Sequence, residues 1–206
     1  MGSKDISKAI LEYFKRSISR LREINLRLDP NRESMLTMSR ELYLVVRNGF
    51  KELYRGNFEL SKKYLERSNE VVKSIYKVIE SSDLYIDLSK IAYDPLREYV
   101  ELILLYSTLT GDDKYIKFLN VIKPEIVLDG YIDYAGELHR MAVSKLIDDD
   151  CEGALKYISI LENIYIDLLS NPLDNYVYRD YKRKVDKIRA ILDKVKSDYL
   201  YRCSRR

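Results

Sequence analysis

The stretch PLREYVELILLYSTLTGDD, residues 95–113, decides the fold class. Pro95 suits the first position of a helix, and Gly111 is a typical residue just past a helix end. Between them, residues 100–106 read VELILLY, and only Glu101 interrupts the apolar run. A helix that is apolar on nearly every side is typical of a core or an oligomer interface. The stretch therefore predicts an α-helix that is buried in a core or in an oligomer interface.

On both sides of this helix, apolar residues recur with a period of three to four, which indicates further helices. Only 7 Gly and 4 Pro occur in 206 residues, too few for the tight turns of an all-β fold. Asp29-Pro30 predicts the end of one helix and the start of another, with Asp29 as the N-cap. We expect an all-α, up-and-down bundle of about seven helices that forms a single domain over residues 1–206. The expected helices span 8–28, 30–53, 59–79, 96–109, 131–147, 152–169 and 174–201, with short segments at 84–93 and 114–121.

Composition excludes disordered and membrane classes. Apolar residues make up 46% and charged residues 33% of the chain, too apolar for disorder and too charged for a membrane protein. No run approaches the roughly 18 apolar residues of a transmembrane helix, and the polar N-terminus lacks the apolar region of a secretory signal. Cys151 and Cys203 lie far apart without metal-type spacing. We therefore expect free thiols and a cytoplasmic location.

The net charge of +3 hides an uneven distribution. Residues 176–206 carry 11 Lys and Arg against 4 Asp, whereas the remainder carries 25 basic and 29 acidic residues. This asymmetry indicates contact with a polyanion, and a solvated helix face is the alternative. Lys and Arg would neutralise phosphates, and exposed tyrosines would stack on unpaired bases. The candidate residues for nucleic-acid binding are Arg22, Lys90, Arg97, Lys182, Arg183, Lys184, Lys187 and Arg189, with Tyr178 and Tyr181 for stacking.

Four segments carry a family pattern in the same order along the chain. They are MSREL at 38–42 with LYR at 53–55, LREYVE at 96–101, GYIDYAGELHRM at 130–141, and the last helix, with Tyr181, Val185, Ile188, Leu192, Tyr199, Leu200 and Arg202. The third segment is the most specific, because it follows the pattern Gly-x-x-Asp-x-x-Gly-Glu-Leu-x-Arg. Together the four segments resemble the translin/Trax family over nearly the whole chain.

This resemblance implies a seven-helix bundle that assembles into a hollow octamer and holds single-stranded RNA or DNA. Within the family, translin-type subunits bind nucleic acid without cleaving it. Trax-type subunits carry carboxylates that cleave RNA with Mg²⁺. The resemblance therefore implies a homo-oligomer, a nucleic-acid partner and no membrane partner.

Glu98 and Glu101 are the most informative pair for chemistry. Their i, i+3 spacing places both carboxylates on one helix face, where they can share a divalent ion. Mg²⁺ prefers oxygen ligands, keeps several waters and can lower the pKa of an attacking water. By resemblance, both residues lie where Trax-type subunits have paired glutamates, and translin-type subunits lack the second. The alternative is a solvated or salt-bridged helix face, although the apolar neighbours argue against exposure on two sides.

A third carboxylate is harder to assign. The family resemblance places a Trax aspartate in the helix at 152–169, where an ungapped alignment gives Ile166, with Asp167 one residue later. One residue rotates a helical side chain by about 100°, enough to turn it away from the site. Glu137 is another candidate metal ligand, with an ion pair to Arg40 or Arg140 as its alternative. His139 is the only histidine and lacks partners for a catalytic triad, so we expect it to be packed or at an interface.

The sequence leads to three functional hypotheses. The first is a protein that binds single-stranded nucleic acid and acts as a Mg²⁺-dependent endoribonuclease, with Glu98, Glu101 and Asp167 as catalytic residues. Its metal ligands are Glu98, Glu101 and Glu137. The second is a translin-like binder without catalysis, in which the glutamates are structural. The third is a helical scaffold for protein partners.

Overall fold

The computed structural model describes residues 3–82 and 87–203. These residues form six α-helices and two short 3₁₀ helices, and no strand occurs among them. The elements are α1 Ser3–Tyr54, α2 Phe58–Ser81, η1 Leu88–Ala92, α3 Tyr93–Thr110, η2 Ile116–Val121, α4 Pro124–Ile147, α5 Cys151–Ser170 and α6 Tyr181–Cys203. The predicted all-α class is confirmed.

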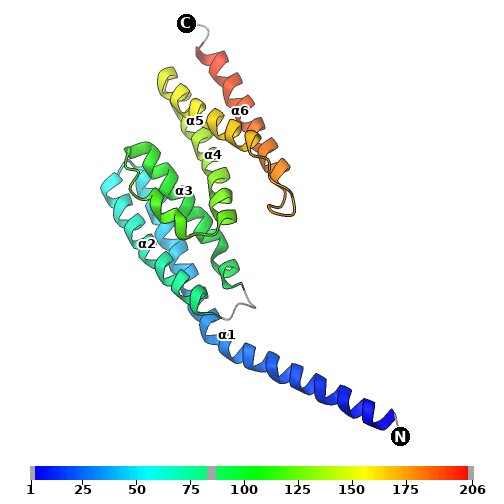
Figure 1. Ribbon diagram of the computed structural model, residues 1–206. Coiled ribbons are helices and arrows are strands. Elements are labelled where there is room, and N and C mark those ends of the chain that lie inside the picture. The colour runs from blue at the N-terminus through cyan, green and yellow to red at the C-terminus, as the bar shows by residue number, and fades with distance from the viewer. Residues whose placement is uncertain (1–2, 83–86, 204–206) are drawn as a thin grey trace.

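The helices form two groups that share α4 as their link (Figure 1). The C-terminal half of α1 packs against α2 and α3, and α4 packs against α3 on one side and against α5 and α6 on the other. One cluster of buried side chains runs through both groups, from Met35 in α1 to Ile188 in α6. The N-terminal part of α1 projects away from both groups (Figure 1).

The helix α3 is buried in the core of the chain, which is one of the two positions that its sequence predicts. Its side chains from Leu96 to Tyr106 are largely buried, and those of Tyr99, Val100 and Leu102 are fully buried. Only the strip that carries Glu98 and Glu101 is half-buried rather than buried. The near-continuous apolar run is explained by contacts with α1, α2 and α4 on different sides of α3.

The predicted helix break at Asp29-Pro30 is wrong. The backbone of α1 stays helical from Ser3 to Tyr54, with Pro30 inside the helix. Proline keeps a helical φ and removes one amide donor, so it weakens a helix without forbidding it. Here Pro30 is exposed, and water can reach the carbonyl that loses its donor. Buried residues such as Met35 and Leu42 then hold the following turns in place.

The expectation of two free thiols is also wrong. Cys151 and Cys203 form a disulfide with a Cα–Cα distance of 6.0 Å across 52 residues of sequence. Cys151 begins α5 and Cys203 ends α6, and these helices are neighbours, so their ends meet. An ion pair between Arg202 and Asp149, at 2.8 Å, joins the same two ends. The cysteines therefore no longer support a reducing compartment. Disulfides persist in oxidising compartments and, in hyperthermophiles, inside the cell.

Two other boundaries differ from the predicted ones. The helix expected from residue 131 begins at Pro124, which occupies the first turn of α4. The last helix begins at Tyr181 rather than near residue 174, because Asp174 accepts a hydrogen bond from the amide of Tyr176 in a turn that precedes the helix. In the described part of the chain, no helix combines the length and apolar character needed to cross a membrane.

Candidate functional site

Glu98 and Glu101 lie beside the closest approach of α3 and α4. A Cβ atom on Gly130 of α4 would stand 2.6 Å from the Cβ of Val100 and 2.8 Å from the carbonyl oxygen of Arg97. Both distances are too short for a real side chain, so only glycine permits this contact. The first glycine of the GYIDYAGELHRM segment therefore sets the distance between the helices at the acidic pair.

The surroundings of Glu98 and Glu101 disfavour the charged form of both carboxyl groups. Burial and, after it, the nearby charges of Glu137, Asp133 and Glu98 together raise the pKa of Glu101 to about 8. Burial also raises the pKa of Glu98, although the charges of Arg97 and Arg47 partly oppose this shift. Carboxyl groups in such surroundings bind protons or cations readily. The electrostatics therefore favour a cation near the pair.

Two carboxylates of α4 face the pair but already have partners. Arg97 contacts Asp94 of its own helix at 3.4 Å and Asp133 at 3.1 Å, and the second ion pair joins α3 to α4. Glu137 is buried and pairs with Arg140 at 3.1 Å. It also accepts a hydrogen bond from the hydroxyl of Tyr54 in α1. The ion-pair alternative for Glu137 is thus the arrangement that the structure contains, with Arg140 as the partner.

A third acidic residue of α4, Asp129, is one that the sequence reasoning missed. Its carboxylate accepts hydrogen bonds from Tyr93, Tyr178 and Lys184. Burial alone would raise the pKa of Asp129, but these bonds outweigh it and lower the pKa. The spacing of Asp129, Asp133 and Glu137, each four residues apart, was the available signal, because it places them on one helix face. This row extends the polar surface from the acidic pair toward α6.

The candidate third carboxylate lies elsewhere. Asp167 is exposed on α5, where its charge acts on the hydroxyl of Tyr131. The preceding residue, Ile166, is also exposed. Among residues 3–82 and 87–203, no group of three or more His, Cys, Asp or Glu is arranged to hold a metal ion. The residues present fit a site with two carboxylates completed by water, and do not fit one with three.

The basic candidates fall into three places. Arg22 lies exposed on the projecting part of α1, and Lys90 lies exposed on η1. Lys182, Arg183, Lys187 and Arg189 are exposed on α6, whereas Lys184 is directed inward to Asp129. Tyr178 and Tyr181 are buried and hydrogen-bonded, so they are not open to bases. Tyr176, which is 99% exposed, is the free tyrosine of this region.

His139 is packed between α4 and α6, as expected. Burial and the nearby charge of Lys194 lower its pKa, and Asp198 opposes this shift. Its Nε2 atom is buried and has no hydrogen-bond partner among the described residues. Within the described chain, this nitrogen therefore has no serine or carboxylate partner of the kind a catalytic triad needs.

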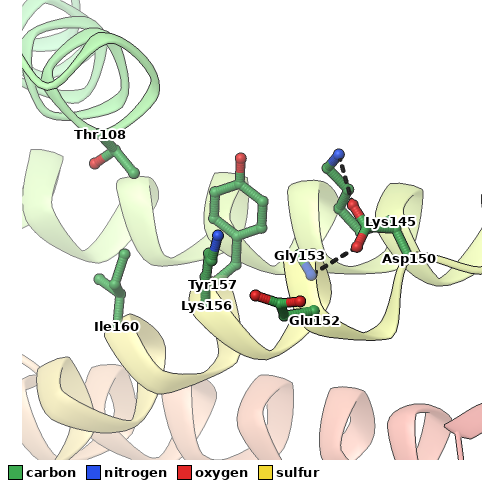
Figure 2. Close-up of a pocket in the computed structure, with 8 residues that line it drawn as sticks. All are labelled: Thr108, Lys145, Asp150, Glu152, Gly153, Lys156, Tyr157 and Ile160. Atoms are coloured by element: carbon green, nitrogen blue, oxygen red, sulfur yellow. Dashed lines mark hydrogen bonds and ion pairs between the residues drawn. The ribbon is translucent and has the colours of Figure 1, made fainter.

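The cavities of the described chain lie away from the acidic pair. Figure 2 shows a cavity of about 480 Å³ where the ends of α3 and α4 meet the start of α5. In it, Asp150 pairs with Lys145 at 2.9 Å and accepts a hydrogen bond from the Gly153 amide at 2.8 Å, which caps α5 (Figure 2). A second cavity, of about 760 Å³, lies between the end of α5 and the start of α6 and is mainly apolar. Neither cavity contains a convergent set of unpaired polar groups.

Comparison with solved structures defines the class of fold. The chain superposes on C3PO, the translin/Trax complex. The TM-score is 0.77 with AfC3PO bound to duplex RNA, at 24% sequence identity over 94% of this chain and 98% of that one. The TM-score is 0.75 with apo-NeC3PO, at 22% identity over 90% and 96% of the two chains. The chain therefore has the fold of C3PO subunits.

The chain is also similar in sequence to one archaeal protein. The chain is 27% identical over 172 residues to the uncharacterized protein MJ0175 of Methanocaldococcus jannaschii, which covers 82% of this chain and 75% of that protein. No model of a known protein family matches the chain.

Proposed function

We propose that the chain is a translin/Trax-type protein that binds single-stranded RNA, or single-stranded DNA, as a homo-oligomer. The observation that carries this proposal is the C3PO fold, which extends over nearly the whole chain. One neighbour with this fold was crystallised with duplex RNA, which supports RNA as the class of ligand. By family resemblance, the assembly would be an octamer.

The basic face of α6 is the proposed phosphate-binding surface. Lys182 and Lys187 are exposed and form no ion pair with another described residue, so both are available to phosphates. Arg183 and Arg189 pair with Asp180 at 3.1 Å and Asp193 at 3.7 Å. Exposed pairs of this kind are weak and can be exchanged for phosphate contacts. Binding through such contacts weakens as salt rises, because it releases counterions.

We further propose that the protein cleaves RNA with Mg²⁺ bound between Glu98 and Glu101. The support is the acidic pair itself. Both carboxylates are half-buried, neither forms an ion pair with another described residue, and their surroundings raise the pKa of both. When bound there, Mg²⁺ would polarise the scissile phosphate and lower the pKa of a water. Arg97, held by Asp133 and Asp94, stands on the same helix as the pair. By exchanging Asp94 for a phosphate oxygen, it would orient the RNA strand.

A second candidate is a translin-like binder without catalysis. The observation that favours it is the position of Asp167, which does not join Glu98 and Glu101 in a metal-binding group within the described chain. In this case the two glutamates would be structural, and binding would not depend on them.

The deciding experiment is incubation with a labelled, unstructured RNA in Mg²⁺ or in EDTA. We expect cleavage by the wild type in Mg²⁺, and loss of cleavage but not of binding in Glu98→Gln/Glu101→Gln. The matched control is Glu59→Gln/Glu80→Gln, which neutralises two exposed glutamates of α2 and should cleave normally. Equal binding without cleavage in all three proteins would establish the non-catalytic binder.

The nucleic-acid class is tested with the same proteins. Single-stranded RNA, single-stranded DNA and duplex RNA are titrated at several salt concentrations, with Lys182→Ala/Lys187→Ala beside the wild type. We expect the variant to bind more weakly and to show a shallower salt dependence, because two phosphate contacts are lost. Absence of salt-sensitive binding to all three ligands would leave the protein-scaffold hypothesis.

A further inference from the structure

The projecting part of α1, residues 10–28, is a helix without a partner; we call it the arm. In Figure 1 it extends beyond the C-terminal end of α2, and no other helix of the described chain runs alongside most of its length. Its large apolar side chains are exposed, with Leu11 and Phe14 at 60%, Ile18 at 54% and Leu21 at 66%. Exposed apolar surface of this extent on a soluble chain marks an interaction site.

The apolar stripe of the arm continues the core-facing stripe of α1. At every seventh residue, α1 carries Phe14, Leu21, Leu28, Met35 and Leu42. Met35 and Leu42 are fully buried, and Leu28 is half-buried near the end of α2. The stripe becomes exposed only where α2 has ended at Ser81. The arm therefore presents, to solvent, the face that a second helix covers elsewhere along α1.

The spacing of the apolar residues indicates which kind of helix would pack against the arm. The members of the stripe alternate by three and four residues, as in the a and d positions of a heptad repeat. Leu11, Ile18 and Asn25 occupy a positions, and Phe14, Leu21 and Leu28 occupy d positions. We propose that the arm pairs with the arm of a second copy of this chain in a parallel, in-register, two-stranded coiled coil.

Asn25 supports the parallel arrangement. In a parallel, in-register pair, an asparagine at an a position lies opposite the same asparagine of the other copy, and the two amides hydrogen-bond. In the antiparallel register that pairs the whole stripe, Asn25 would lie opposite Phe14, which offers no hydrogen bond. A polar group that is buried without a hydrogen-bond partner destabilises the pair. The sequence of the stripe thus disfavours the antiparallel pair.

The charges beside the stripe support the same arrangement. Lys15 and Arg22 are exposed and occupy the e positions. In a parallel pair they lie beside Ile10 and Ser17 of the other copy, where their aliphatic stems can cover apolar surface. In the antiparallel pair, Lys15 of one copy would lie beside Arg22 of the other, and like charges repel. The parallel arrangement therefore avoids the repulsion between Lys15 and Arg22 that the antiparallel arrangement would bring.

This pairing goes beyond the proposed function, because it uses neither the acidic pair nor the basic face of α6. Arms that pair would join two bundles whether or not the chain binds RNA. An arm variant can therefore lose pairing and keep salt-sensitive RNA binding per chain, and the two proposals can fail separately.

Cysteine cross-linking tests the pairing and its direction. In an in-register parallel coil, Ile18→Cys places two thiols opposite each other, within disulfide reach. We expect mild oxidation to give a covalent dimer of Ile18→Cys and only traces of one for the matched control Arg16→Cys, on the outer face of the arm. Cross-links equal in the two variants, or absent from both, would overturn the proposal. Cross-linking only between Ile18→Cys and Leu21→Cys chains would establish the antiparallel pair instead.

A second variant shows whether the stripe holds the copies together. Ile18→Asp/Leu21→Asp puts two charges in the stripe, whereas Ser19→Asp/Leu26→Asp puts two charges outside it on the same arm. We expect loss of the arm-dependent association in sedimentation equilibrium for the first variant and none for the second, with circular dichroism showing the bundle intact in both. Equal association of the two variants would contradict pairing through the stripe.

Discussion

At the scale of single residues, Glu101 is a carboxyl group whose charged form the fold strongly disfavours. Its pKa in the folded chain, about 8, lies well above the ordinary value of 4.5. Between these values the folded chain keeps a proton that the unfolded chain has released, so stability falls as pH rises. The slope for one such group is at most about 1.4 kcal/mol per pH unit, and partial exposure reduces it.

We therefore expect Glu101→Gln to stabilise the chain in alkaline buffer. The variant should match the wild type near pH 4.5, exceed it increasingly up to about pH 8, and keep a constant advantage above that. Urea unfolding from pH 4.5 to 9 in EDTA measures this, with exposed Glu80→Gln as the control. A pH-independent difference between Glu101→Gln and wild type would contradict the assigned environment of Glu101.

Some of the candidate site could be predicted residue by residue, and some could not. The i, i+3 spacing of Glu98 and Glu101, with apolar neighbours, was enough to predict a half-buried acidic pair. The partners of Glu137 and Asp133 depend on which side chains of α1 and α3 reach α4. A spacing rule within one helix cannot supply contacts between helices, so the Tyr54 hydrogen bond and the inward direction of Lys184 were missed.

At the scale of elements, two glycines of α4 have opposite roles. Gly130 lies where α3 and α4 touch, and a Cβ there would stand 2.6 Å from Val100. Gly136, six residues later, has no neighbouring atom within 4 Å of the position of its Cβ. In a helix interior, glycine without a packing role is destabilising relative to alanine by about 0.5–1 kcal/mol.

Alanine at these two positions should therefore change stability in opposite directions. We expect Gly130→Ala to lower the free energy of unfolding by about 1–3 kcal/mol, because overpacking forces α3 and α4 apart. Gly136→Ala should raise it by up to about 1 kcal/mol. Urea unfolding of the two variants beside the wild type measures both effects. A stabilising Gly130→Ala would show that α3 and α4 are farther apart than described.

Helices were predicted more reliably than their ends. Apolar periodicity located α2, α3 and α5 closely, because burial of one face determines these elements. The rule that proline ends a helix gave a wrong break at Pro30, because the buried stripe of α1 carries the helix through it. The helix expected from residue 131 begins earlier, since Pro124 starts α4 about 1.7 turns before Gly130.

At the scale of the whole molecule, the disulfide is the strongest link between the last two helices. It closes a loop of 52 residues, and a loop of this length gives about 4 kcal/mol in the chain-entropy estimate. We expect Cys151→Ser/Cys203→Ser to lose about 2–4 kcal/mol of stability. Urea unfolding with and without dithiothreitol measures this. Only the wild type should respond to the reductant, and an equal response of the variant would contradict the bond.

The sequence could not reveal this disulfide, because two cysteines 52 residues apart meet only when α5 and α6 have packed. The overall class of fold could be predicted, since it follows from helix lengths, short loops and an ordered set of family segments. The projection of the arm from the bundle could not be predicted, because an apolar stripe has the same sequence pattern whether another helix covers it or not.

The length of α1 also governs how the molecule moves in solution. Its 52 residues span about 78 Å as a helix, whereas a compact chain of 206 residues has a radius of gyration of only about 17 Å. A tumbling copy therefore sweeps a sphere much larger than its own volume, and the N-terminal end of α1 travels along the edge of that sphere. When two copies diffuse together, their tips meet long before their bundles do.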